Sequence, residues 1–106
     1  MQLEYKTRKL EKECNDIRKA TRAYGDKGAR KLHQRVQELR AADSLEEMVA
    51  YHIGGCHQLH GDRKGEYALE LSQPYRLIVE PVLDSKMEVT GVKVVKRVEV
   101  VDYHGN

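Results

Sequence analysis

Several residue types are rare or missing in this 106-residue chain: tryptophan and phenylalanine are absent, and proline occurs only twice. A hydrophobic core therefore has to be built from aliphatic side chains, methionines and the six tyrosines. The two cysteines, Cys14 and Cys56, lie outside any C-x-x-C motif, and we expect both thiols to be reduced. A chain of this length buries about two-thirds of its unfolded surface, which is enough for a core without disulfides or metal. We expect a single domain spanning residues 1–106.

Long apolar runs are also missing from the chain. No N-terminal stretch resembles a signal peptide, and no segment approaches the roughly 18 apolar residues of a membrane span. We therefore expect a cytoplasmic protein with no membrane partner.

Charged residues make up 34% of the chain and are unevenly distributed. Residues 1–40 carry 12 Lys and Arg against 6 Asp and Glu, whereas residues 41–106 carry 7 against 11. A basic half suggests contact with nucleic acid. A solvated helix surface rich in Lys and Arg explains the same asymmetry, so charge alone does not decide between the two.

Hydrophobic spacing predicts two helices in the N-terminal half. The first has its apolar face at Leu10, Cys14, Ile17 and Tyr24. The second has its apolar face at Ala29, Leu32, Val36 and Leu39. Gly25 separates the two patterns and suits a turn, so we expect the helices to pair as an antiparallel hairpin. Residues 43–47 indicate a helix N-cap followed by a short helical turn.

The pattern changes to a period of two outside this helical region. Residues 2–5 alternate as in a short strand, and four further strands are expected at residues 57–60, 67–71, 75–80 and 87–104. Pro81 should limit the continuation of its strand, and Gly91 should mark a bulge or bend. Helices followed by strands with tight turns predict an α+β fold with a largely antiparallel sheet.

Two polar clusters interrupt the strand pattern and are candidates for chemistry. At the C-terminus, Asp102, Tyr103 and His104 follow a valine-rich strand, although a frayed polar tail has the same composition. The second cluster spans residues 56–65 and contains two histidines and two cations beside a glycine-flanked turn. The glycines could let backbone N–H groups approach a phosphate, but a hairpin turn needs them as well. We expect the last strand to run beside the strands that flank this turn.

Together the two clusters suggest cleavage of an RNA phosphodiester. Attack by the 2′-hydroxyl needs a base, an acid for the leaving 5′-oxygen, and cations that stabilise the transition state. Histidine suits both proton transfers, and Lys and Arg suit the charge. A zinc site is the alternative, with candidate ligands at Cys56, His57, His60 and His104. Their spacing matches no common zinc motif, so we expect neither a metal nor another cofactor.

The two clusters carry a resemblance to a known family. The chain reads LHGDRKGEYALELSQPYRLIVE and, later, VEVVDYH. These strings resemble the HigB-type toxins of the RelE/ParE toxin–antitoxin superfamily, in which L-K-G-D-R-x-G-x-[WY]-S-x-x-[IL] precedes [WY]-R-[IL]-x-F and a terminal D-Y-H. The likeness covers residues 56–80 and 98–104 closely and the N-terminal helices only in pattern and length. His60 stands where the family has Lys, and the segment 81–95 is longer than in the short toxins.

The resemblance implies a RelE-like microbial RNase fold, with an N-terminal helical hairpin packed on a curved, largely antiparallel sheet. It implies ribosome-dependent, metal-independent cleavage of translated mRNA. The implied catalytic residues are His57, Asp102, Tyr103 and His104. The implied RNA- or phosphate-binding residues are His60, Arg63, Lys64 and Arg76. The implied partners are the ribosome, mRNA and a HigA-like helix-turn-helix antitoxin, with operator DNA contacted only through the antitoxin complex.

Two other functions remain open at this stage. A toxin of the ParE branch would act on DNA gyrase without RNA chemistry, but the presence of His57 together with the Asp-Tyr-His string argues against it. An inactive homologue that only binds an antitoxin would share the fold, because a fold does not by itself establish an activity.

Overall fold

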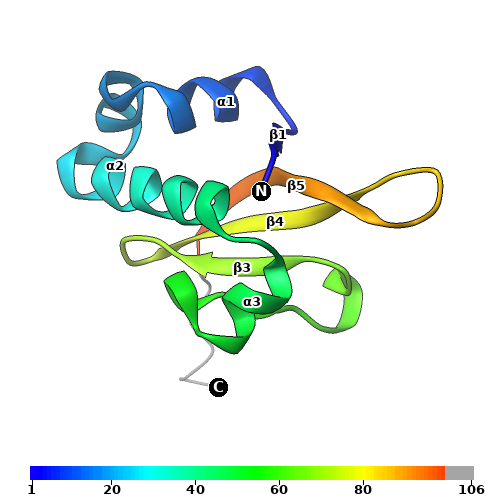
Figure 1. Cartoon of the computed structure of the whole chain (residues 1–106). Coiled ribbons are helices and arrows are strands. Elements are labelled where there is room, and N and C mark those ends of the chain that lie inside the picture. Colours follow the sequence, from blue (N-terminus) through cyan, green and yellow to red (C-terminus); the bar gives the residue numbers. More distant parts are fainter. Residues whose placement is uncertain (100–106) are drawn as a thin grey trace.

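The computed structural model describes the backbone of residues 1–99 and the side chains of residues 1–95. This part of the chain is an α+β fold with three α-helices and one five-stranded mixed sheet (Figure 1). The helices are α1 (Arg8–Asn15), α2 (Ile17–Ala41) and α3 (Leu45–Ala50). The strands are β1 (Leu3–Tyr5), β2 (His57–Gln58), β3 (Tyr67–Glu70), β4 (Tyr75–Leu83) and β5 (Val89–Glu99). Two 3-10 turns, η1 (Ile53–Gly55) and η2 (Gly61–Arg63), flank β2.

The sheet has the strand order β1-β5-β4-β3-β2. Every neighbouring pair is antiparallel except β1 and β5, which are parallel, so the largely antiparallel sheet is confirmed. The expectation that the last strand lies beside the strands flanking the 61–65 turn is wrong. β4 lies between β5 and β3, because the short turn before Tyr75 folds β4 back directly onto β3.

The first helical segment is broken, which the periodicity did not predict. Asp16 is extended (φ −128°, ψ 108°), and its carboxylate accepts from the N–H groups of Arg18 and Lys19, so it ends α1 and caps α2. Ile17 consequently leaves the apolar face and is 46% exposed. An aspartate at this position competes for helix N–H groups and therefore favours a new helix start.

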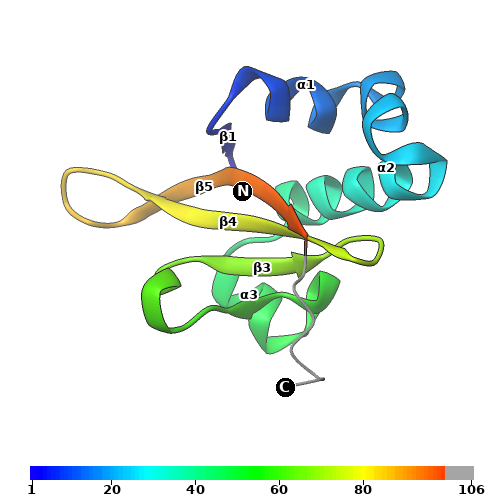
Figure 2. The same ribbon diagram turned by 180° about the vertical axis from the view of Figure 1, so that it is seen from behind.

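The second helical segment agrees with the sequence. Gly25 has φ 78° and lets the chain turn back, so that residues 26–41 run in the opposite direction to α1 in Figures 1 and 2. The predicted apolar face is buried at Ala29, Leu32, Val36 and Leu39. α3 begins after Ser44, whose hydroxyl accepts from the Glu47 N–H, as expected for a capped turn.

β4 continues through Pro81, contrary to expectation. Pro81 lies opposite Val92, whose N–H points away from β4 and donates to Gln2. The Pro81 nitrogen therefore faces the other edge of β4. On that edge the pairing with β3 does not reach Pro81, because β3 begins at Tyr67, opposite Val79. No ladder hydrogen bond is lost there, so the strand tolerates proline.

Gly91 marks a bulge, as predicted. The β4–β5 register shifts beside it, and its α-carbon lies so close to β1 that an added Cβ would be 2.7 Å from the Gln2 carbonyl oxygen. Beyond this point β4 and β5 extend as a long hairpin, whose turn is held by the Asp84 carboxylate accepting from two backbone N–H groups (Figure 1).

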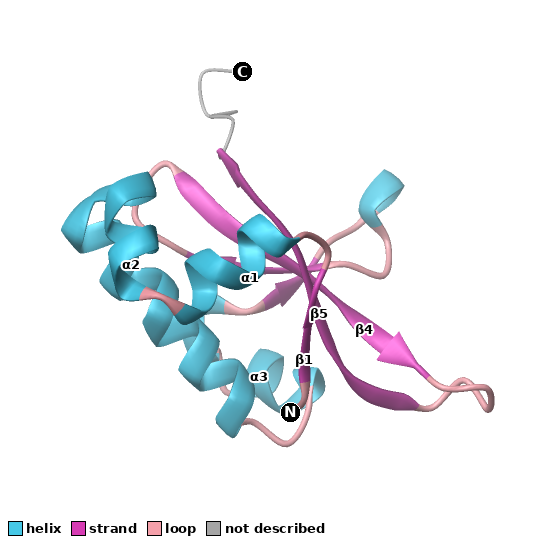
Figure 3. Cartoon of the chain, turned by 90° about the horizontal axis from the view of Figure 1, so that it is seen from above, coloured by secondary structure: helices cyan, strands magenta, loops and turns pink. Residues whose placement is uncertain are grey.

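The helices cover one face of the sheet, as Figure 3 shows from above. The core between the layers combines the apolar face of α2 with buried side chains of α3 and of strands β3, β4 and β5. On the opposite face, the described side chains form a small apolar cluster of Ala68, Ile78 and Val95, with Leu59 packed against it. None of the helices in the described part of the chain combines the length and apolar composition needed to cross a bilayer.

Candidate active site

His57, the candidate base, lies at the start of β2 with an exposed side chain. Its Nδ1 is 3.0 Å from the carbonyl oxygen of Gly55. A carbonyl oxygen only accepts, so Nδ1 carries the proton in this contact. The neutral ring then has an unprotonated Nε2, which is the nitrogen able to accept a proton from a substrate.

His57 lines a pocket of about 290 Å³ at the end of the sheet where β3 turns into β4. Arg76, one of the predicted phosphate-binding residues, lines the same pocket, together with Lys31 and Arg35 of α2. Within the described residues the side chains of Arg76 and Lys31 make no hydrogen bond or ion pair. Two uncommitted cations thus share a pocket with a histidine that has a free ring nitrogen.

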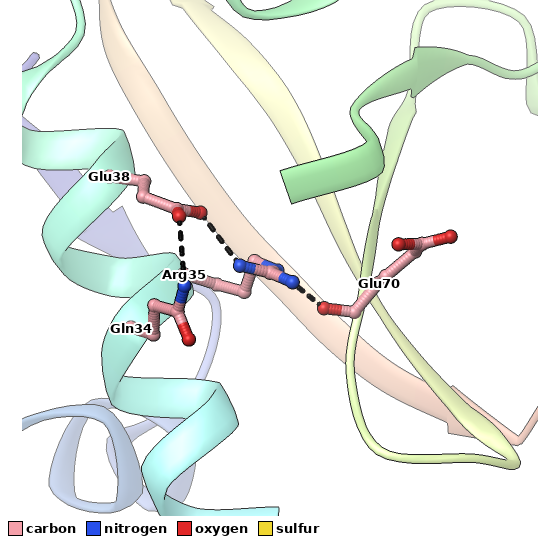
Figure 4. Close-up of polar contacts among 4 residues, drawn as sticks. All are labelled: Gln34, Arg35, Glu38 and Glu70. Carbon is pink, nitrogen blue, oxygen red and sulfur yellow. Dashed lines mark hydrogen bonds and ion pairs between the residues drawn. The ribbon is translucent and has the colours of Figure 1, made fainter. Parts of the chain in front are cut away.

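Arg35 has a different task, because it connects α2 to the end of β3 (Figure 4). Its Nε donates to the Glu70 carbonyl oxygen at 2.6 Å, and a terminal nitrogen donates to the Glu38 carboxylate at 2.9 Å. The Arg35 side chain is only 7% exposed, and it therefore depends on both partners. A buried guanidinium with fixed partners positions neighbouring groups rather than binding substrate.

The glycines before β2 let the backbone approach this connection closely. Gly54 has φ 63°, and a Cβ added to it would be 2.8 Å from the side chains of Arg35 and Glu38. Gly55 has φ 66°, and a Cβ there would be 2.6 Å from the side chain of Glu70. Both glycines are therefore required by conformation and by space, and they bring the Gly55 carbonyl to His57.

Three of the predicted catalytic residues, Asp102, Tyr103 and His104, lie outside the described residues. The described end of the last strand nevertheless has a definite place. Glu99 lies opposite Tyr75, and Tyr75 lines the pocket that contains His57. The last strand therefore leads the chain to the rim of this pocket.

The remaining predicted phosphate-binding residues lie elsewhere. His60, Arg63 and Lys64 are exposed in and around η2, at the opposite end of β3 from Glu70 and Arg76. None of them is among the residues that line the His57 pocket. The structure thus brings together His57 and Arg76 of the predicted set and separates the loop cations from them.

Sequence reasoning missed the contribution of α2 to this pocket. Arg35 lies three residues after Leu32 and four before Leu39, so its spacing places it on the buried face of the helix. A charged residue in an otherwise apolar stripe indicates a buried polar contact, and this signal could have identified it. Lys31, beside it, carries no comparable signal.

The two cysteines are buried and unpaired. Burial raises the pKa of the Cys56 thiol to about 11. Burial, followed by the neighbouring Glu13 carboxylate, raises the pKa of the Cys14 thiol to about 12. Both thiols are therefore protonated at neutral pH, which disfavours nucleophilic chemistry. Among the side chains of residues 1–95, no group of three or more His, Cys, Asp or Glu is placed to hold a metal ion.

Comparisons with known proteins found no match for this chain, whether against family models, curated proteins or solved structures.

Proposed function

We propose that this protein is a metal-independent endoribonuclease, with His57 acting as the general base. The observation that carries the proposal is the state of this side chain. Its Nδ1 is occupied by the Gly55 carbonyl oxygen. Among the side chains that the structure describes, its Nε2 has no partner, and neither have Arg76 and Lys31, which line the same pocket. This combination provides a proton acceptor beside a binding site for a phosphate.

The chemistry needs no group beyond side chains. His57 Nε2 takes the proton of a ribose 2′-hydroxyl, the 2′-oxygen attacks the adjacent phosphorus, and the bond to the 5′-oxygen breaks. An acid returns a proton to that oxygen, which leaves a 2′,3′-cyclic phosphate and a 5′-hydroxyl end. Arg76 and Lys31 are placed to stabilise the negative charge on the phosphorane. His104 is the proposed acid, because Glu99 lies opposite a pocket residue and the intervening chain can span at most roughly 18 Å.

The biological context that we propose follows the resemblance to HigB-type toxins. The protein would be the toxin of a type II toxin–antitoxin pair, it would cleave translated mRNA on the ribosome, and a HigA-like antitoxin would neutralise it. The fold proposed with it is that of the RelE-like microbial RNases. The α+β architecture, with helices on one face of a largely antiparallel sheet, is compatible with this proposal.

Expression of single variants in bacteria tests the proposed base and acid. Replacing His57 with Gln, or His104 with Ala, should reduce cleavage by about 10²- to 10⁴-fold, the usual contribution of positioned proton transfer. Growth arrest should disappear, and so should new 5′-hydroxyl ends in sequenced mRNA. His52→Asn is the matched control, because His52 is exposed, lies outside the pocket, and has the left-handed φ of 55° that asparagine tolerates.

The choice of control matters for interpretation. His33 is unsuitable, because its Nε2 lies 3.1 Å from the Glu13 carbonyl oxygen and contributes to helix packing. Full toxicity of a soluble His57→Gln variant would remove this residue from the mechanism. Growth arrest without new mRNA ends would favour a target other than RNA.

A further inference from the structure

A second hollow is lined by residues of α1 and of the first turns of α2. These two segments are coloured blue to light blue in Figure 1. Its volume is about 460 Å³. The residues that line it are Lys9, Lys12, Glu13, Lys19, Arg22 and Ala23. None of them lines the pocket that contains His57, so the two sites are separate.

The break at Asp16 brings these cations together. Lys9 and Lys12 lie one turn apart on α1, and Lys19 and Arg22 lie one turn apart on α2. Because the chain changes direction between the two helices, both pairs line the same concave surface. Like charges one turn apart destabilise a helix, so this arrangement has no evident role in holding the helices.

The four cations have no partners in the part of the chain that the structure describes. Other basic residues are neutralised there: Arg30 pairs with Asp26 at 3.1 Å, and Arg35 pairs with Glu38 at 2.9 Å. The hollow contains one carboxylate, that of Glu13, which is buried and accepts a hydrogen bond from the Tyr24 hydroxyl. The lining therefore carries four positive charges against one negative charge.

We propose that this hollow binds a small ligand with several phosphate groups, such as a nucleoside triphosphate or a short polyphosphate. Its size is within the range of about 300–1,000 Å³ that is typical of small-molecule sites. Lysines supply point charges, and the arginine can hold two phosphate oxygens at once. The net charge of the lining complements a ligand with about three negative charges.

A compact ligand fits this surface better than a nucleic acid strand. A strand needs cations spaced along its backbone, whereas these four converge on one hollow. Further along α2, Arg30 lies outside the hollow and pairs with Asp26. The proposal is independent of the ribonuclease activity, since it uses none of the residues of that site.

Calorimetric titration of the purified chain with inorganic tripolyphosphate tests the proposal, with inorganic phosphate for comparison. We expect tripolyphosphate to bind at physiological salt at least tenfold more tightly than phosphate, and to weaken as salt is raised. A double variant with Lys12→Gln and Arg22→Gln should lose at least tenfold in affinity. The matched control changes Lys6→Gln and Lys27→Gln, two exposed cations outside the hollow, and should bind as the unchanged chain does.

A further variant tests whether the charge of the hollow's lining determines the affinity for tripolyphosphate. Glu13→Gln keeps an acceptor for the Tyr24 hydroxyl and removes the negative charge of the hollow, so affinity for tripolyphosphate should rise. Absence of tripolyphosphate binding, or an equal loss in the two double variants, would overturn the proposal. Tighter binding of a 15-nucleotide single-stranded RNA than of tripolyphosphate, lost in the Lys12/Arg22 variant, would overturn it in favour of a nucleic acid contact.

Discussion

Within the described residues, the Gly55 carbonyl oxygen is the hydrogen-bond partner that orients the His57 ring. Gly55 holds this position with a φ of 66°, a conformation that other residues adopt only with strain. The position of the hydrogen on the neutral ring of the candidate base therefore depends on a local backbone turn two residues away. A histidine at the same sequence position without this turn would be free to present either nitrogen.

The cysteines illustrate a residue-scale effect of burial on protonation. Cys56 is 1% exposed and Cys14 is 2% exposed, and in each case burial is the largest cause of the raised pKa. Removing a thiolate's water shell disfavours the charged form, so the proton is retained at higher pH. Both cysteines therefore behave as small hydrophobic side chains.

Thiol reactivity and stability should follow from these pKa values. Alkylation of native Cys56 at pH 8 should be at least about 100-fold slower than in the urea-unfolded chain, since its thiolate is rarer by that factor. Above pH 9 the unfolded chain releases thiol protons that the folded chain keeps, so the free energy of unfolding should fall as pH rises from about 9 towards 11–12.

Urea titrations between pH 8 and pH 11 measure this slope. A variant with both cysteines replaced by Ala serves as the reference. Its free energy of unfolding should fall less steeply with pH, because it lacks the two thiols and keeps every other titrating group. Equal slopes would show that the thiols do not contribute.

The helix α2 contributes residues to the core, to the His57 pocket and to the second hollow. One face buries Ala29, Leu32, Val36 and Leu39 against the sheet. Arg35, on the same side, connects to Glu70 at the end of β3 and thereby supports the pocket of the candidate base. The first turns of the helix, before Gly25, contribute cations to the second hollow.

Replacing Arg35 with Met should destabilise the protein by about 2 kcal/mol. The change removes the hydrogen bonds that Arg35 donates to the Glu70 carbonyl oxygen and to the Glu38 carboxylate, and one such bond contributes about 0.5–1.5 kcal/mol, or more where a partner is charged. Cleavage should also weaken, because the end of β3 lines the pocket. Denaturant unfolding and mapping of mRNA ends measure the two effects.

Gln37→Met is the matched control for this change, because Gln37 is exposed on the same helix. A surface substitution of this kind usually shifts stability by less than ~0.5 kcal/mol. If both variants were equally stable, Arg35 would not contribute to the connection between α2 and β3.

The two candidate sites occupy different parts of the molecule. The His57 pocket is lined by the end of the sheet and by two residues of α2, and the second hollow is lined by residues of α1 and the first turns of α2. The His57 pocket has two uncommitted cations in the described residues and has Tyr75 as its aromatic residue. Such a small lining offers little surface for orienting an RNA strand.

We therefore expect the isolated protein to cleave naked RNA poorly and to depend on the ribosome for substrate orientation. Orientation of the substrate can lower the activation barrier by several kcal/mol. Purified chain should convert a translated mRNA in a reconstituted translation mixture at least 100-fold faster than the same mRNA alone. Gel analysis of labelled transcripts measures both rates. Robust, sequence-specific cleavage without ribosomes would contradict this expectation.

Elements with a local sequence signal could be predicted before the structure was known. A period of 3.6 located the buried face of residues 26–41, and a period of two located β3, because each pattern is set by neighbouring residues. Gly91 was predicted as a bulge, since a glycine within a strand indicates a close backbone approach. The resemblance to HigB-type toxins implied His57 and Arg76 as site residues, and both line one pocket.

Contacts between segments that are distant in the sequence became evident from the tertiary structure alone. Asp16 interrupted an apparently continuous helical face, because a cap competes locally with periodicity. β4 tolerated Pro81 because the pairing with β3 does not reach it on that side, a fact that belongs to strand pairing and not to the proline. Arg35 joined the candidate site, and the loop cations were excluded from it, because packing of α2 on β3 sets the pocket. The break at Asp16 is a local capping effect, whereas the tolerance of Pro81 and the lining of the pocket depend on contacts between residues far apart in the chain, which spacing along the sequence does not encode.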